Sequence, residues 1–162
     1  MFAENQNDLI FVDLALQTAG EGKYLIERKN INLLTSQQLS KYQTIIISAN
    51  NVSNGIEQLK DFVNNGGGLI LFPSSNPDAV SFNRTLTQLG LGNAQAFVGK
   101  VNGSDIKINF DKTDFGHPVF QNIFKSDDKK KYESPELNAY YKLTQSGKQI
   151  ISLVDGSSFL DE

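Results

Sequence analysis

The stretch from Ile56 to Pro73, IEQLKDFVNNGGGLILFP, predicts a helix, a glycine stop and a strand in direct succession. Asn65-Gly66 ends the helix, because glycine enters the left-handed cap conformation without a clash at Cβ. Leu69–Phe72 is a continuous apolar run that is too short for a helix, and it predicts a strand covered on both faces. Together these elements form half of a βαβ unit. The apolar residues of the helix recur at helical spacing and share one face: Ile56, Leu59, Phe62 and Val63.

Upstream of this stretch the chain predicts a further strand and a first helix. Thr44–Ile47 is a β-branched run and predicts a central strand of the sheet. The first helix is predicted from about residue 8 to residue 19, with Asn5 or Asn7 as its cap. A strand at Leu9–Val12 is the alternative, but the apolar pattern continues without a turn signal, which favours the helix. The other elements predicted here are a short strand at Tyr24–Arg28, one helical turn at Ser36–Lys41, and a cap at Ser53 or Asn54 for the helix that begins at Ile56.

Downstream, the alternation of helix and strand is predicted to stop at Gly90. Asp78–Leu89 fits a helix whose inward residues are Val80, Phe82 or Asn83, Leu86 and Leu89. The segments after Gln95 are predicted to be antiparallel strands. The first pair is Gln95–Val101 and Asp105–Phe110, joined across the hairpin signal Asn102-Gly103. An irregular segment from Asp111 to Phe124 follows, and the second pair is Leu137–Thr144 and Gln149–Val154.

These elements predict an α/β fold of three layers, in which helices cover both faces of a mostly parallel, flavodoxin-like sheet. The antiparallel strands of the C-terminal half form an addition to that sheet. At 162 residues, the chain is expected to be a single domain that is large enough to bury a sizeable core.

The composition excludes several classes of protein. A net charge of −3 and a pI near 5.2 argue against a nucleic-acid surface, which needs clustered Lys and Arg. Cysteine is absent, so disulfides, thiolate metal sites and a cysteine nucleophile are excluded. No apolar run approaches the length of about 20 residues that spans a bilayer. Met1–Asp8 is too polar for a signal peptide.

Both ends of the sequence suggest a piece cut from a longer protein. A doubly wound sheet begins with a strand, yet almost nothing precedes Asp8. At the other end, the chain stops at Glu162 as another apolar element starts. The expected consequence of a missing strand is an unpaired sheet edge, through which the chain would form a homo-oligomer.

Several stretches of the chain follow the pattern of a known family. They are Tyr42–Ile47, Leu59–Pro73, Phe82-Asn83 with Leu89–Gly92, and the His-Pro-aromatic stretch Gly116–Phe120 with Phe124. From about Asp8 to Glu162 the chain resembles the class I glutamine amidotransferase-like domain of large bacterial membrane proteins of the BatA (aerotolerance regulator) type. The resemblance implies a Rossmann-like sheet with the arrangement of that domain.

The resemblance also implies a setting for the chain. In such proteins this domain sits beside transmembrane helices and a von Willebrand factor A domain. A membrane-associated parent protein is therefore expected, with this domain on its extracytoplasmic side and with other domains or other proteins as partners. Neither neighbour lies within these 162 residues, so contact with a membrane would come only through flanking segments.

A catalytic glutamine amidotransferase of this fold carries a cysteine at a glycine-flanked elbow between a strand and a helix. The equivalent place here is Pro73–Pro77, where only Ser74 and Ser75 could act as nucleophiles. A serine nucleophile needs a base and an oxyanion hole, and His117 is the one histidine in the chain. Val119 stands where the family's catalytic motif continues with an acid. The sequence therefore predicts a non-catalytic module, a pseudoenzyme, with a serine hydrolase or transferase as the alternative.

The sequence predicts no metal ion and no cofactor. Asp105, Asp111 and Asp114 lack the D-x-D-x-D-G spacing of a calcium loop. Gly66–Gly68 precedes a strand instead of opening a helix, so it is interpreted as a cap and turn and not as a phosphate loop. Two further groups of residues do not predict a binding site. Lys129–Lys131 follow Asp127-Asp128 and are expected in a solvated loop. Tyr132, Tyr140 and Tyr141 fit an exposed aromatic patch or a core equally well.

Any ligand is expected in the crevice outside the carboxyl ends of the parallel strands. A domain that senses a small ligand or a glycan is the third hypothesis for function. The polar residues predicted to line this crevice are Asn50, Asn51, Ser74, Ser75 and Asn76.

Overall fold

The computed structural model describes residues 1–19, 22–99, 107–121, 133–137, 139–144 and 147–162. It divides into two compact units, Met1–Leu91 and Gly92–Glu162. The boundary falls after Leu91, one residue beyond Gly90, where the sequence predicted the end of the α/β alternation. The prediction of one amidotransferase-like domain over residues 1–162 stays a prediction.

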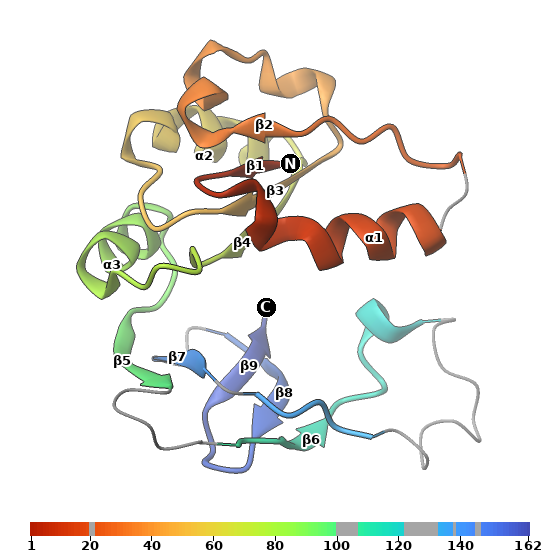
Figure 1. Ribbon diagram of the computed structural model, residues 1–162, viewed down its shortest axis with the longest axis vertical. Helices are drawn as coiled ribbons and strands as arrows, with labels where there is room; N and C mark the ends of the chain where they lie inside the picture. The colour runs from red at the N-terminus through yellow and green to blue at the C-terminus, as the bar shows by residue number, and fades with distance from the viewer. Residues whose placement is uncertain (20–21, 100–106, 122–132, 138, 145–146) are drawn as a thin grey trace. The chain divides into compact units, whose positions relative to one another are not determined.

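The first unit contains a four-stranded parallel sheet with the strand order β2-β1-β3-β4 (Figure 1). The register places Ile47 of the central strand β3 opposite Phe2 of β1 on one side and opposite Leu71 of β4 on the other. This sheet confirms the predicted α/β class and its parallel part. The strands are β1 (Phe2–Ala3), β2 (Lys29–Asn30), β3 (Thr44–Ser48) and β4 (Gly68–Phe72).

The beginning of the sheet corrects the sequence analysis. Phe2–Ala3 is the strand that was thought to be missing, and it pairs with both β2 and β3. A strand of two residues is too short to show any periodicity, which is why the sequence concealed it. The strand predicted at Tyr24–Arg28 is also wrong, because the pairing segment is Lys29–Asn30 and Leu25 is 95% exposed. The outer strands of the sheet are therefore β2 and β4.

The three α-helices of the first unit are close to their predicted positions. The α1 helix (Ile10–Ala19) continues from a 3-10 turn, η1 (Gln6–Leu9), and the Asn5 side chain accepts a hydrogen bond from the backbone N–H of Asn7 as its cap. The α2 helix (Ile56–Asn64) ends at Asn65-Gly66, where Gly66 has a φ of 90°. The α3 helix (Ala79–Gln88) is capped by Asp78 and ends before Gly90, which has a φ of 75°.

The predicted cap of α2 is wrong. Ser53 and Asn54 belong to a 3-10 turn, η4 (Ser53–Gly55), and Gly55 occupies the cap position without a side-chain hydrogen bond. A Cβ at Gly55 would lie 2.4 Å from Cδ2 of Leu34, so packing decides this residue. Leu34 lies in η2 (Ile31–Ser36), which precedes η3 (Leu39–Lys41), and these two 3-10 helices include most of the turn predicted at Ser36–Lys41.

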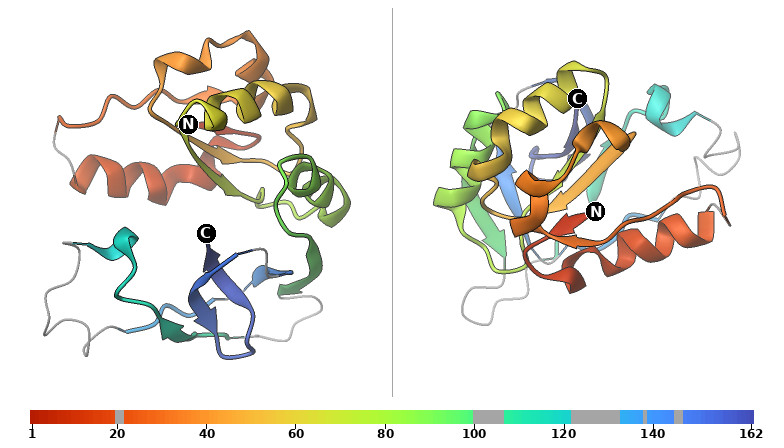
Figure 2. Two further views of the ribbon diagram at one scale, coloured as in Figure 1. Left: turned by 180° about the vertical axis from the view of Figure 1, so that it is seen from behind. Right: turned by 90° about the horizontal axis from the view of Figure 1, so that it is seen from above.

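Apolar side chains pack on both faces of the sheet, and α1 and α2 lie on opposite faces of it (Figure 2). On the α1 face, Ala3, Leu9 and Ile46 are buried, with Val12 and Leu16 packed against them. The α2 face holds the larger cluster, whose buried members are Phe2, Leu34, Leu39, Ile45, Ile47, Ala49, Val52, Ile56, Leu59 and Phe62.

Four predicted core positions are exposed instead. The strand Gly68–Phe72 is not covered on both faces: Ile70 is 46% exposed and Phe72 is 40% exposed, because β4 is an outer strand and α1 packs over Ala3 and Ile46 of the inner strands. On the helices, Val63 is 43% exposed and Val80 is 72% exposed, whereas Phe82 and Leu86 are buried as predicted.

The second unit is built from antiparallel strands, as predicted for the C-terminal half. One sheet pairs β5 with β7, and a second sheet has the order β6-β8-β9. A short 3-10 turn, η5 (Pro118–Phe120), follows β6. The strands are β5 (Ala94–Gly99), β6 (Phe110–Thr113), β7 (Ala139–Leu143), β8 (Gln149–Leu153) and β9 (Ser158–Asp161).

The prediction that Gln95–Val101 and Asp105–Phe110 form a hairpin is wrong. β5 pairs with β7, and Val98 lies opposite Tyr140 across more than forty residues of chain. Ile108, in the second predicted hairpin strand, forms an isolated bridge with Leu137. The Asn102-Gly103 turn lies outside the described residues. The segment expected to be irregular from Asp111 instead contains most of strand β6.

Candidate functional site

The candidate site lies where three loops leave the carboxyl ends of β1, β3 and β4. Because these strands are parallel, their carboxyl ends share one edge of the sheet. The loops bring together the polar residues predicted there and several that were not predicted. The predicted ones are Asn50, Asn51, Ser74, Ser75 and Asn76, and the added ones are Glu4, Asp8, Ser48 and Thr85.

Asp8 is the centre of a hydrogen-bond network that ties the three loops together. Its Oδ2 accepts a hydrogen bond from the backbone N–H of Ser75 at 2.9 Å. The hydroxyls of Ser48 and Ser74 lie 3.3 Å from the same oxygen. Ser48 and Ser74 are both buried, and the hydroxyl of Ser48 also reaches the carbonyl oxygen of Pro73 at 3.2 Å. One carboxylate therefore holds the ends of β3 and β4 against the start of α1.

The pKa of the Asp8 carboxyl is consistent with its role in holding these loops together. Burial acts to raise the pKa of the Asp8 carboxyl, but the hydrogen bonds from Ser75, Ser48 and Ser74 outweigh burial and lower the pKa below its ordinary value. Asp8 is consequently ionised at neutral pH. An ionised carboxylate that already accepts several hydrogen bonds is a strong structural anchor.

Glu4 and Thr85 support the loop that follows β3. Glu4 Oε1 accepts hydrogen bonds from the backbone N–H groups of Asn50 at 3.0 Å and Asn51 at 3.3 Å. Thr85 of α3 is fully buried; its hydroxyl donates to the carbonyl oxygen of Asn50 at 2.9 Å and lies 3.3 Å from the N–H of Val52. The backbone of this loop is thus fixed from both sides.

Asn50 links the loops after β3 and β4. Its Nδ2 donates to the carbonyl oxygen of Asn76 at 2.7 Å. The side chain is 6% exposed, and no group in the described part of the chain donates to its Oδ1. A buried acceptor without a partner is costly, so Asn50 Oδ1 is an unfavourable feature of the loop after β3.

A pocket of about 470 Å³ opens at the same edge, where β1 lies between β2 and β3. Asn30 and Asn51 each use their Oδ1 to accept a backbone N–H two residues later, at Asn32 and Ser53. Their Nδ2 groups are donors. Among the described residues that line it, Glu4 is the only charged one, so these residues offer one carboxylate, neutral polar groups and no cation for a phosphate. The remaining lining residues are Ile31, Leu34, Thr35, Val52, Asn54 and Gly55.

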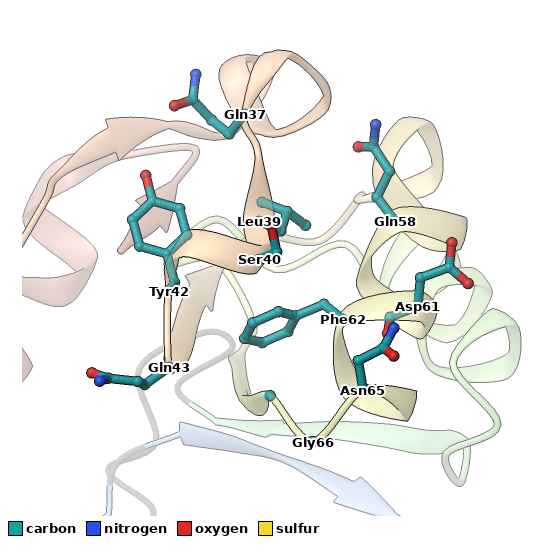
Figure 3. A pocket seen from close by; sticks show the side chains of 11 residues that line it. Gln37, Leu39, Ser40, Tyr42, Gln43, Gln58, Asp61, Phe62, Asn65 and Gly66 are labelled. Carbon is teal, nitrogen blue, oxygen red and sulfur yellow. The ribbon is translucent and has the colours of Figure 1, made fainter.

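A second pocket of about 510 Å³ lies at the opposite, amino-terminal edge of β3 (Figure 3). Tyr42 and Phe62 form its apolar part, and Gln58 and Asp61 line it from α2. Gly67 also lines the pocket, and a Cβ added there would come within 2.4 Å of the Phe62 ring. Gly66–Gly68 therefore serves as the end of α2 and a close-packing turn.

The serines and the histidine considered for catalysis belong to different units. Ser74 and Ser75 lie in the first unit, and His117 lies in the second. His117 is 8% exposed; its Nδ1 accepts the backbone N–H of Val119 at 3.3 Å, and its Nε2 lies 3.0 Å from Oε2 of Glu162. Both ring nitrogens are therefore engaged by residues of the second unit.

The loop of the serines differs from a nucleophile elbow. An elbow places the nucleophile between the last residue of a strand and the first turn of a helix. Here β4 ends at Phe72 and α3 begins at Ala79, so a loop with two prolines separates them. Ser74 is buried in that loop and is hydrogen-bonded to Asp8.

No protein-family model, curated protein or solved structure gives a significant match to the chain.

The remaining candidate residues have structural roles where the structure describes them. Asp114 forms an ion pair with Lys148 at 2.8 Å and accepts the N–H of Gly116. The Tyr140 hydroxyl donates to Asp155, and Tyr141 is buried. The described residues contain no cluster of three His, Cys, Asp or Glu side chains that could hold a metal ion. Asp105, Lys129–Lys131 and Tyr132 lie outside the described residues.

Among the helices that the structure describes, none has the length and apolar character required to cross a bilayer.

Proposed function

We propose that this chain is a non-catalytic interaction module built on a flavodoxin-like, amidotransferase-like scaffold. The main support is that Asp8 holds the loop Pro73–Pro77, which contains Ser74 and Ser75, by hydrogen bonds. The Ser74 hydroxyl lies 3.3 Å from an ionised carboxylate in a part-buried network, and the same carboxylate holds the N–H of Ser75 at 2.9 Å. Ser74 is buried, and a carboxylate whose pKa is lowered is a weak base for activating its hydroxyl.

The strand order supports the finer description of the scaffold. In a flavodoxin-like sheet the order begins 2-1-3-4, with the ligand crevice between β1 and β3. The first unit has the order β2-β1-β3-β4, and Glu4 and Asn51 line the pocket at that crevice. This match supports a flavodoxin-like parallel sheet as the core of the module.

The setting that we propose follows from the family resemblance. The parent protein would be anchored in a bacterial membrane by flanking segments, with this module outside the cytoplasm and other domains or proteins as its partners. The coding sequence on either side of residues 1–162 tests this directly. Flanking runs of about 20 apolar residues are expected, and a parent gene without them would contradict the membrane setting.

Reaction with a fluorophosphonate probe, which labels activated serines, tests the absence of catalysis. We expect no more labelling of the folded chain than of the unfolded chain, and no hydrolysis of simple esters or amides. Labelling of Ser74 or Ser75 that disappears in His117→Ala would establish the alternative function, a serine hydrolase or transferase.

A small neutral ligand is the second candidate function, and the pocket of about 470 Å³ favours it. Its amide-rich lining, with one carboxylate and no cation, suits a hydroxylated molecule such as a glycan better than a phosphate ester. NMR titration with a panel of neutral mono- and oligosaccharides tests this function. Shifts of the Asn30 and Asn51 side-chain amides are expected on binding, and unchanged spectra across the panel would exclude this ligand class.

A further inference from the structure

Strand β4 lies at one edge of the parallel sheet, and its own residues carry no charge, proline or bulge. Outer strands are normally blunted by charged side chains, prolines or bulges. Gly68–Phe72 contains no charge and no proline, and its five residues pair with β3 without a break in register. The uncharged stretch extends beyond the strand in both directions, from Phe62 to Pro77.

The hydrogen bonds of β4 show which backbone groups point outward. The N–H of Gly68 donates to Gln43, and the carbonyl oxygen of Phe72 accepts from Ala49, so both residues turn their backbone groups toward the β3 side. Because the direction alternates along a strand, the N–H and C=O groups of Leu69 and Leu71 point away from β3. No hydrogen bond within the described part of the chain uses these four outward groups.

The side chains of β4 alternate in the same way. Leu69 and Leu71 pack against the core cluster on the α2 face. Ile70 lies opposite Ile46 and Phe72 lies opposite Ser48, so both belong to the α1 face, where they remain 46% and 40% exposed. The edge thus combines free backbone groups with an apolar surface.

We infer that β4 is the site at which a second copy of this chain pairs, antiparallel, to form one continuous sheet. This inference rests on the proposed function as an interaction module and names its partner. A twofold axis through Ile70 places Leu69 opposite Leu71 of the copy. These outward-pointing residues then exchange four backbone hydrogen bonds across the interface.

The sequence of β4 is complementary to itself in this register. Ile70 meets Ile70 of the copy as a non-hydrogen-bonded pair, in which side chains come closest. Phe72 lies opposite Gly68, whose missing side chain leaves room for the ring. No like charges meet, because the nearest charged residues in sequence are Asp61 and Asp78. A second copy therefore fits this edge without any change of the strand.

Sedimentation of the complete chain over a range of concentrations tests the inference. The apparent mass is expected to rise from 17.9 kDa toward about twice that value. Pairs of five-residue strands bury less than the roughly 1,600 Å² of a standard interface, so the dimer should dissociate on dilution. A chain that remains monomeric at about 1 mM would overturn the inference.

Charge at Ile70 tests the register. Ile70→Lys and Ile70→Glu should each abolish the rise in mass, because like charges then meet at the axis, and an equimolar mixture of the two should restore it. Val80→Lys, an exposed position on α3, is the matched control and should dimerise like the unchanged chain. Dimerisation that survives both Ile70 variants would place the interface elsewhere and contradict the inference.

Amide exchange gives a readout that is independent of mass. Raising the concentration should slow exchange at Leu69 and Leu71 and leave Ile70, whose N–H points toward β3, unchanged. The outcome also separates this inference from the proposed function. Serine labelling would overturn the proposed function alone, whereas an unlabelled monomer would overturn the edge pairing alone.

Discussion

At the scale of single residues, Asp8 connects more of the first unit than any residue that the sequence singled out. It follows β1, and its Oδ2 meets residues from the ends of β3 and β4. The sequence placed Asp8 at the start of a helix and gave it no partners. Its partners are 40 or more positions away, and no local pattern carries information over such a separation.

Asp8→Asn should lower the free energy of unfolding by about 1–3 kcal/mol at neutral pH, because it replaces a charged acceptor of three donors. The pKa of Asp8 is lower in the folded chain than in the unfolded chain. Its contribution is therefore complete above the unfolded pKa, and it is lost as the pH falls through the folded pKa. Urea unfolding of both chains across that range measures the effect.

The free energies of unfolding of the two chains are expected to differ at neutral pH and to become equal in acid. Asp61→Asn, at an exposed carboxylate of α2, is the control and should change the free energy of unfolding little at any pH. A gap that is the same at every pH would show that the charge of Asp8 contributes nothing.

Gly67→Ala should destabilise the first unit by about 1–3 kcal/mol, because the new Cβ would lie within 2.4 Å of three atoms of the Phe62 ring. The ring is buried in the α2-face cluster and cannot move freely. Gly68→Ala is the neighbouring control, since its Cβ would lie 3.2 Å from Oγ1 of Thr44 and 3.7 Å from the carbonyl oxygen of Gln43. Thermal unfolding followed by circular dichroism compares the two, and equal melting temperatures would contradict the packing argument.

At the scale of elements, α3 supports the candidate site through one side chain. Thr85 lies fully buried on α3 and bridges the carbonyl oxygen of Asn50 and the N–H of Val52. The helix therefore does more than cover the sheet: it fixes the backbone of the loop between β3 and α2. Thr85 was not singled out by the sequence analysis.

Thr85→Val keeps the shape of the side chain and removes its hydroxyl. Two backbone groups lose their partner, so we expect a loss of about 1–3 kcal/mol in the free energy of unfolding. Faster amide exchange at Val52 should accompany it. Val80→Thr, the reverse exchange at an exposed position on the same helix, should show neither change. Unchanged exchange at Val52 in Thr85→Val would count against the bridging role.

The elements that were predicted correctly share a local cause, and the errors share a non-local one. The spacing of apolar residues predicted helix α2, and a run of β-branched residues predicted strand β3. The bounds of both elements are close to the prediction. β1 was missed because two residues show no period. β4 was predicted as fully covered because an apolar run says nothing about the position of its strand in the sheet. The Asn102-Gly103 signal predicted a local hairpin, but β5 pairs instead with the distant strand β7.

At the scale of the whole molecule, the chain joins an α/β unit to an antiparallel unit. The sequence predicted this change of architecture from the loss of helical periodicity after Gly90, and the boundary between the compact units lies after Leu91. The site was predicted in part: the crevice at the strand ends follows from parallel topology alone. Glu4, Asp8 and Thr85 could not be found, because their roles depend on which loops meet.

Residues 1–91, produced alone, should fold. Both core clusters of the parallel sheet consist only of residues up to Leu89, and the hydrogen bonds of Asp8 stay within the same segment. The fragment should show cooperative unfolding and slow amide exchange along β3. The control is residues 1–72, which keep all four strands but lack Phe82, Thr85 and Leu86, the buried residues of α3, and should fail to fold. If the longer fragment were unfolded while the complete chain folds, the parallel sheet would depend on the second unit for its stability.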